Sequence, residues 1–378
     1  AINIFLKKNE GFRLHMIRCN EPDADVVRQY VSPARELTFE IQDFSRETDS
    51  RKQDAWLAKK ASEPFTLFET DLFYFALIRY NEKQSGYYLK AHHIISDGAS
   101  IFLMGNEIDT IYHQIKAGLT VSDAPNPSYL DYITEEQHFL ESSEFAQEGA
   151  FWHEKLLPLP EVTPFASKKA ATGPSPLAAN SLTFAFTSEL RQKINTFSQT
   201  QGISRFQTIM AALGIYIHRY AGVNDICIGF PSHNRSNFDR MRTVGMFVST
   251  LPLRFTVNGT LDFIILCLTI KSELKSALTN GRRYPFDILV GELHKASGTE
   301  PGPIINVSLI GQPDYTSNFQ TRYLFSGEET LPLSIHINPA NHDIAGVLEM
   351  TFNYQIEVFT EAERSEERRV GKECRSRW

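Results

Sequence analysis

The stretch His92-His93-Ile94-Ile95-Ser96-Asp97-Gly98 carries the strongest structural and chemical signal in the chain. It follows an apolar run at 87–91 that predicts a strand, and a helical pattern begins after it. Ionisable side chains at the end of a strand are typical of functional sites, because loops on a rigid scaffold carry chemistry. His93 offers an imidazole that can take up a proton near neutral pH. Asp97 offers an anion that can hold the loop, and Gly98 permits a backbone turn that other residues resist.

The two adjacent histidines are expected to have different environments. Neighbouring side chains on a strand point to opposite faces, so only one of the two can face a channel. Metal binding is a weaker interpretation, because no cysteine or glutamate cluster completes a set of ligands. We therefore expect no metal at this motif.

Composition narrows the class of protein. The chain has 378 residues, of which 42% are hydrophobic and 22% charged, enough for a large core divided between two lobes. A formal charge of -7 argues against a general nucleic-acid binder. No apolar run reaches the length of a membrane span. Four scattered cysteines without a CxxC pair favour a reducing, cytoplasmic setting.

The first half of the chain alternates predicted strands and helices. Residues 73–80 and 87–94 are aromatic and β-branched runs joined by turn-forming residues, which predicts a hairpin. After the motif, apolar residues at helical spacing predict a helix that ends near Gly118. Its expected buried face comprises Ile101, Met104, Ile108, Ile111 and Tyr112. Residues 132–156 are interpreted as one further helical stretch.

A proline-rich segment at 158–180 is interpreted as a linker. The second half after it again combines predicted strands and helices. The remaining elements are strands expected at 181–187, 225–230, 247–255, 304–310, 333–337 and 347–355, and helices at 188–201, 206–220 and 263–278. Mixed strands and helices in two halves predict two α/β sandwich lobes. The expected boundaries are 1–157 for the first lobe and 181–363 for the second.

Residues 364–378 differ from the rest of the chain, because they carry many charges and show no apolar periodicity. We interpret them as the translation of a sequencing adapter and exclude them from the fold. The alternative is a charged, solvated helix. The chain also begins without Met, and we interpret it as a fragment of a longer protein.

The H-H-x-x-x-D-G stretch resembles the signature of the chloramphenicol-acetyltransferase-like superfamily, and most closely that of the condensation domains of nonribosomal peptide synthetases. Five further segments resemble family motifs and occur in the family's order. One of them, at 8–13, keeps only Glu10 and Arg13 of the usual pattern, and another has Ser249 where Asn is usual. The segments lie at 8–13, 129–132, 228–235, 244–254 and 283–287. The first family motif would lie upstream of Ala1, and residues 2–6 are then expected to form a strand.

The resemblance implies a fold and a set of roles. The fold is a V-shaped pseudo-dimer of two lobes with a central tunnel. His93 is the imidazole that faces the tunnel, and His92 is turned inward with a structural role. Asp97 is an organiser that pairs with an arginine, and both Arg235 and Arg13 remain candidates. His233 occupies a variable position of its motif and is interpreted as incidental.

The activity that the resemblance implies is amide bond formation. An upstream peptidyl carrier domain would present an acyl or peptidyl thioester, and a downstream one an aminoacyl thioester. Their phosphopantetheine arms would deliver both substrates, so no bound cofactor is expected. A neighbouring adenylation domain in the same polypeptide is expected as well. The donor, the acceptor and the stereochemical subtype stay open.

Three alternatives are weighed against this interpretation. An epimerisation domain shares the double histidine, but the segments at 244–250 and 284–286 fit condensation better. A stand-alone acyltransferase that uses coenzyme A is disfavoured, because the D-F-G-W-G string of its plant-type members is absent. A non-catalytic docking module would be expected to carry a degraded histidine motif.

Overall fold

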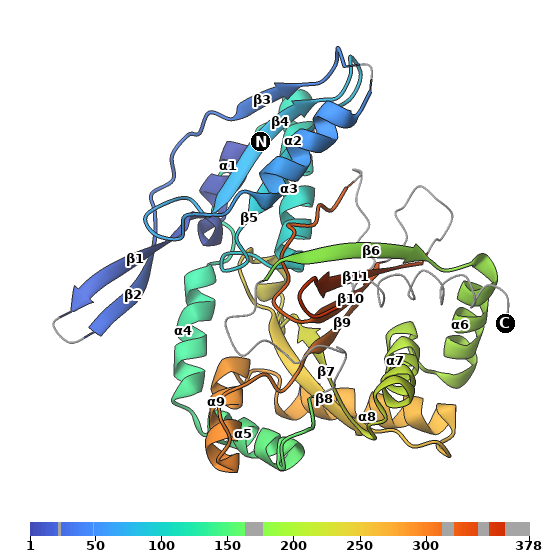
Figure 1. The fold of residues 1–378 in the computed structure, drawn as a ribbon. Helices are drawn as coiled ribbons and strands as arrows, with labels where there is room; N and C mark the ends of the chain where they lie inside the picture. Colours follow the sequence, from blue (N-terminus) through green and yellow to red (C-terminus); the bar gives the residue numbers. More distant parts are fainter. Residues whose placement is uncertain (22–23, 48, 163–176, 312–320, 339–347, 360–378) are drawn as a thin grey trace. The chain divides into compact units, whose positions relative to one another are not determined.

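The segment around the double histidine joins a strand to a helix in the computed structural model (Figure 1). Strand β5 (Ser85–Ala91) precedes it and helix α3 (Gly98–Lys116) follows it. Strand β5 pairs antiparallel with β4 (Phe73–Arg79), so the predicted hairpin is confirmed. The structure describes residues 1–21, 24–47, 49–162, 177–311, 321–338 and 348–359.

The chain divides into two mixed α/β units, which confirms the predicted class. Unit 1 comprises Ala1–Glu141, His233–Val248 and Tyr315–Ser326, and unit 2 comprises the remainder. The fold class therefore agrees with two lobes. The expected V shape and tunnel concern the placement of the lobes and stay predictions.

Unit 1 is built on a three-stranded sheet in the order β3-β4-β5 and a separate hairpin of β1 and β2. Helix α3 buries Met104, Ile108 and Ile111 in the core of this unit, as the periodicity predicts, whereas Tyr112 is 52% exposed. The other elements of unit 1 are α1 (Ile2–Lys8), β1 (Leu14–Glu21), β2 (Ala24–Val31), β3 (Glu40–Asp43), α2 (Arg51–Ser62) and α4 (Tyr129–Leu140).

Unit 2 is built on a six-stranded mixed sheet in the order β6-β11-β10-β9-β7-β8. Strand β9 pairs in parallel with β7 and β10, and the other neighbours are antiparallel. Its strands are β6 (Ala179–Ala185), β7 (Asp225–Ser232), β8 (Ser249–Thr256), β9 (Val307–Gly311), β10 (Leu333–Asn338) and β11 (Glu349–Gln355). Its helices are α5 (Ser143–Leu156), α6 (Ser188–Gln201), α7 (Arg205–Ala221), α8 (Phe263–Asn280) and α9 (Phe286–Ser297).

The two units divide the chain differently from the predicted lobes at two places. Unit 1 ends at Glu141 instead of residue 157, so α5 belongs to unit 2. The segment His233–Val248 returns to unit 1, because Val244 and Phe247 are buried in the core of that unit. The expected linker contains the start of β6, and its residues 163–176 lie outside the described residues, as does the tail 364–378.

The expected strand at 2–6 is wrong, because these residues form helix α1. Ile2, Phe5 and Leu6 are buried, and a spacing of three and four residues places side chains on one face of a helix. A run rich in β-branched and aromatic residues favours a strand locally, but packing of this face against the core decides the structure.

The expected helix at 132–156 is two helices. Helix α4 ends at Leu140, and Ser142 caps α5 by accepting a hydrogen bond from the Phe145 amide at 3.2 Å. A serine that accepts such a bond satisfies an otherwise unpaired helical N–H. The break therefore falls at the boundary between the units.

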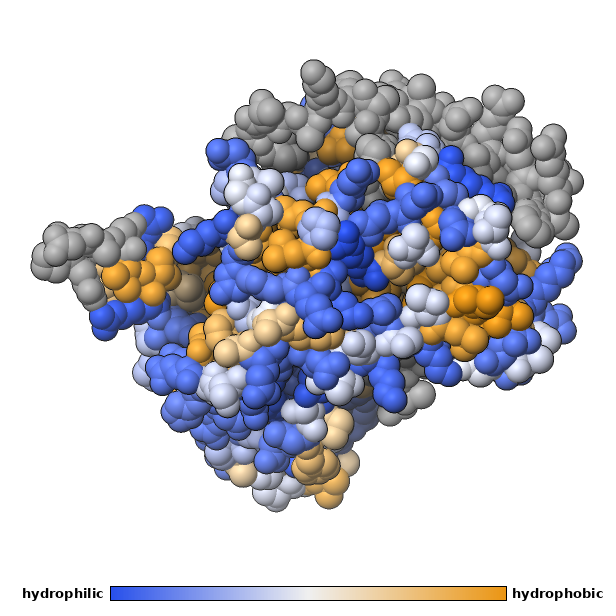
Figure 2. All heavy atoms as spheres, turned by 90° about the horizontal axis from the view of Figure 1, so that it is seen from below, coloured by the Kyte–Doolittle hydropathy of each residue, from blue (hydrophilic) through white to orange (hydrophobic). Residues whose placement is uncertain are grey.

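The surface carries exposed apolar side chains as well as polar ones. Helix α8 exposes Ile265 and Leu268 by 53% and 47%. Figure 2 shows apolar patches bordered by hydrophilic residues on the face seen from below. Scattered apolar side chains are ordinary on soluble folds. Within the described ranges, no helix has the length and apolar character needed to cross a bilayer.

Candidate active site

The double-histidine loop, residues 92–97, connects the end of β5 to the first turn of α3. Asp97 is the N-cap of α3, where its side chain accepts a hydrogen bond from the Ser100 amide at 2.8 Å. The loop is also held by the His92 amide, which donates to the Leu72 carbonyl at 2.8 Å. Both ends of the loop are therefore fixed by the fold.

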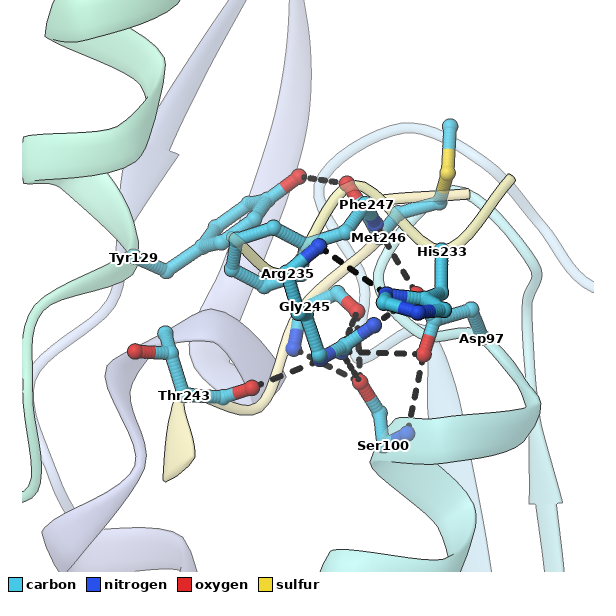
Figure 3. Close-up of polar contacts among 9 residues, drawn as sticks. All are labelled: Asp97, Ser100, Tyr129, His233, Arg235, Thr243, Gly245, Met246 and Phe247. Atoms are coloured by element: carbon cyan, nitrogen blue, oxygen red, sulfur yellow. Dashed lines mark hydrogen bonds and ion pairs between the residues drawn. The ribbon is translucent and has the colours of Figure 1, made fainter. Parts of the chain in front are cut away.

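Asp97 and Arg235 form a buried, two-pronged ion pair within unit 1 (Figure 3). Nη1 of Arg235 lies 2.7 Å from Oδ2 of Asp97, and Nη2 lies 3.0 Å from Oδ1. Both residues are less than 10% exposed. Oδ2 of Asp97 accepts a further bond from the Phe247 amide at 3.0 Å, and the guanidinium lies over the Phe247 ring at 4.2 Å. Parallel bonds between a guanidinium and a carboxylate are strong and geometrically specific.

The environment of Asp97 keeps its carboxylate ionised. Burial alone would raise the pKa of Asp97, because it disfavours the charged form. The bonds and charge of Arg235 and the amides of Ser100 and Phe247 outweigh burial, and the net effect lowers the pKa of Asp97. Asp97 is therefore an anion held in place at the end of the loop.

The choice between the two candidate arginines is now made by geometry. Arg13 does not reach Asp97. Its guanidinium donates to the carbonyls of Leu6 and Lys7 at 2.5 and 2.9 Å, and to that of Ser32 at 3.0 Å. Arg13 thus satisfies carbonyl groups at the end of α1 that the helix leaves free.

Ser100 is a member of this cluster that the sequence analysis missed. It is fully buried, and its Oγ lies 2.8 Å from Nη2 of Arg235. The same Oγ donates to the Gly245 carbonyl at 2.6 Å and accepts from the Gly245 amide at 3.0 Å. The sequence did contain a signal for this role, because Ser100 is a small polar residue on the otherwise apolar face of the predicted helix.

The two histidines differ in exposure, as expected, but for a different reason. Strand β5 ends at Ala91, so neither histidine belongs to the strand, and residues 93–95 form a turn. His92 is half-buried, and its Nδ1 accepts a hydrogen bond from the Ile94 amide at 3.1 Å. Burial, together with the neighbouring His93, lowers the pKa of His92. His93 is exposed at the turn.

We expected Gly98 to allow a backbone turn that other residues resist, but the structure shows no such turn at this position. It is the first residue of α3 and has no positive φ, so its backbone suits any residue. A Cβ at this position would meet no atom within 4 Å. Because Gly98 has no side chain, the space beside the loop at the start of α3 stays open.

The other motif segments of unit 1 surround the Asp97–Arg235 pair. Tyr129 of α4 donates from its hydroxyl to the Met246 carbonyl at 2.7 Å. Its ring packs so closely on Gly245 that a Cβ there would lie 2.2 Å from a ring carbon. A Cβ on Gly11 would lie 2.4 Å from the Val244 carbonyl oxygen. Segments far apart in the sequence are therefore joined by close backbone approaches that only glycine allows.

The late motif at 283–287 has a structural role in unit 2. Tyr284 is buried, stacks on Phe145 and donates to Glu292 at 2.7 Å. A Cβ added to Gly149 would lie 3.0 Å from the Tyr284 ring. The motif therefore anchors α5 to α9. In the part of the chain that the structure describes, no three His, Cys, Asp or Glu side chains gather as metal ligands would.

The described residues thus combine a two-unit α/β fold with a double-histidine loop that a buried Asp–Arg pair holds in place. The sequence profile of the Condensation domain family matches residues 1–368, and the chain belongs to that family. Condensation domains are acyltransferases that form peptide bonds in nonribosomal peptide synthetases.

Individual relatives support the assignment. The chain is 30% identical over 365 residues to one of the plipastatin synthase subunits and 28% over 371 residues to surfactin synthase subunit 1, both from Bacillus subtilis (strain 168). These matches cover 95% and 96% of the chain but only 14% and 10% of the two relatives. The first condensation domain of the CDA synthetase matches with a TM-score of 0.82 at 17% identity, over 98% of this chain and 84% of that one, and supports the fold.

Proposed function

We propose that this condensation domain joins an acyl or peptidyl thioester to an aminoacyl thioester, each carried by a peptidyl carrier domain. The amine of the acceptor attacks the donor carbonyl, a C–N bond forms and the C–S bond breaks. The donor's phosphopantetheine leaves as a thiolate and takes up the proton lost by the amine, which gives the free thiol. The product is an amide on the downstream carrier.

The observation that carries the proposal is the position of His93. Its imidazole is exposed at a turn that Asp97, capping α3 and paired with Arg235, holds in place. An imidazole on a loop held in this way can take the proton from the attacking amine and pass it to the leaving thiolate, or orient the amine. Acid–base help contributes roughly 10²–10⁴-fold, and alignment of two tethered reactants can contribute as much.

The partners follow from the same proposal. Upstream and downstream peptidyl carrier domains would deliver the substrates on phosphopantetheine arms, and the domain itself would bind no cofactor. The relatives are synthetase subunits several times longer than this chain, which supports further domains, including a neighbouring adenylation domain, in the same polypeptide.

The test is product analysis with loaded carriers. The chain is mixed with a panel of acyl- and peptidyl-loaded donor carriers and an aminoacyl acceptor carrier, and the acceptor is examined by mass spectrometry. An amide on the acceptor supports the proposal. An inverted α-carbon without a new amide would indicate epimerisation, and an amide formed from acyl coenzyme A alone would indicate a stand-alone acyltransferase. No turnover with any pair would favour a docking module.

A further inference from the structure

His233 is an imidazole on the segment that supplies Arg235, although the sequence gives it no role. It lies on the segment that leaves β7 and joins unit 1, two residues before Arg235. Its Nδ1 accepts a hydrogen bond from the Arg235 amide at 3.2 Å (Figure 3). The guanidinium of Arg235 holds Asp97. His233 therefore lies on the segment that supplies one partner of the buried pair, and His93 lies on the loop that supplies the other.

His233 and His92 share one local geometry. In each, Nδ1 accepts a bond from the amide two residues further along, Ile94 for His92 and Arg235 for His233. A ring nitrogen that accepts carries no proton, so a neutral ring in this position bears its hydrogen on Nε2. Both rings are therefore set as Nε2–H donors. His92 is half-buried and packs edge-on against Phe65, whereas His233 is exposed.

We propose that His233 is a substrate-binding residue of the condensation site and that its Nε2–H donates a hydrogen bond to a carbonyl oxygen of the thioester-borne substrate. Among the described residues, the bond from the Arg235 amide is the one hydrogen bond that this ring makes. The proposal rests on the proposed function for the substrate class. Thioester-borne chains carry carbonyl groups in the acyl part, in peptide bonds and in the pantetheine amides, so the shared chemistry is a carbonyl acceptor.

The alternative is a purely structural role, in which His233 only fixes the conformation of its own loop. An Nδ1 that accepts the amide of residue i+2 mimics an Asx turn, in which an Asn or Asp side chain does the same. The two roles can be separated by substitution, because they use different ring nitrogens. His233→Asn retains an acceptor for the Arg235 amide but has no donor at the distal position. His233→Gln carries an amide N–H near the position of Nε2.

The first measurement is binding and does not depend on turnover. A hydrolysis-resistant acyl-pantetheine, in which an amide replaces the thioester, is titrated into the chain and its variants by calorimetry. We expect His233→Asn to weaken binding roughly three- to tenfold with an unchanged melting temperature, and His233→Gln to restore much of the affinity. His138→Asn removes another exposed imidazole of unit 1, in α4, and should bind like the unaltered chain.

The second measurement is kinetic, with the carrier pair that the unaltered chain converts. If His233→Asn raises only the KM for the donor carrier, the hydrogen bond from His233 goes to the donor substrate. If it raises only the KM for the acceptor carrier, the bond goes to the acceptor substrate. If His233→Asn binds the analogue as tightly as the unaltered chain and leaves both KM values unchanged, the proposal is overturned. If instead the unaltered chain forms no amide but binds the analogue through His233, the proposed function fails and the binding role stands.

Discussion

Asp97 and Arg235 lie 138 residues apart in the sequence and meet in a buried pair with two parallel bonds of 2.7 and 3.0 Å. Through this contact, the loop that carries His93 is fixed to the segment that leaves β7. Ser100 and the Phe247 amide complete the same cluster. The loop that carries the candidate imidazole is therefore held by a long-range contact, although the motif itself is short.

The first prediction concerns the energy of this pair. Arg235→Ala and Asp97→Asn should each lower the free energy of unfolding by about 3–5 kcal/mol, because removal of one partner leaves the other charged group or its bonds uncompensated in the core. The double variant should be much less destabilised than the sum of the two. Urea unfolding of the four proteins measures this. Strict additivity would show that the two side chains are not coupled.

A matched control is available in unit 2. Arg254 and Asp225 also form a two-pronged pair, at 2.7 Å, but their side chains are 21% and 35% exposed. Solvent screens such a pair, so its coupling energy should be about 1 kcal/mol or less. A coupling equal to that of the buried pair would contradict the role assigned to burial.

The second prediction concerns the close approach at Gly245. Gly245→Ala should destabilise unit 1 by roughly 1–3 kcal/mol, because its Cβ would overlap the Tyr129 ring. In a Tyr129→Ala background, the same substitution should cost far less. Gly98→Ala serves as the control, since a Cβ there meets open space, and its melting temperature should stay unchanged. Equal destabilisation by both glycine substitutions would refute the steric argument.

The third prediction separates the two histidines. His93→Ala should slow product formation, by roughly 10²–10⁴-fold if the imidazole transfers the proton, while its melting temperature stays unchanged because the side chain is exposed. His92→Ala should lower the melting temperature, since it removes the acceptor of the Ile94 amide and the contact with Phe65. Equal melting shifts together with equal activity would overturn the division of roles.

The fourth prediction concerns acid. The pKa of Asp97 is lower in the folded protein than the value of about 3.9 expected for an unfolded chain. Its contribution to stability is therefore fully present above about pH 4 and is lost as the pH falls through the folded-state pKa. The difference in unfolding free energy between the unaltered chain and Asp97→Asn should shrink between pH 5 and pH 3. A constant difference across this range would contradict the ionised state of Asp97.

The sequence by itself determined the elements whose signal is local. Apolar residues at helical spacing placed α3 and its buried residues Met104, Ile108 and Ile111, and alternating runs placed β4 and β5. The H-H-x-x-x-D-G stretch located the candidate site, because strand, polar loop and helix follow one another along the chain. The family also followed from the order of short motifs.

Only the tertiary structure decided the features that depend on distant residues. It selected Arg235 over Arg13 as the partner of Asp97, assigned His233–Val248 to unit 1 and placed Ser100 at the centre of the cluster. It also made residues 2–6 helical, because their buried face packs on a core that local propensity does not describe. A short sequence pattern constrains neighbours along the chain, whereas an ion pair, a close approach to glycine or a core contact depends on where the fold brings residues together.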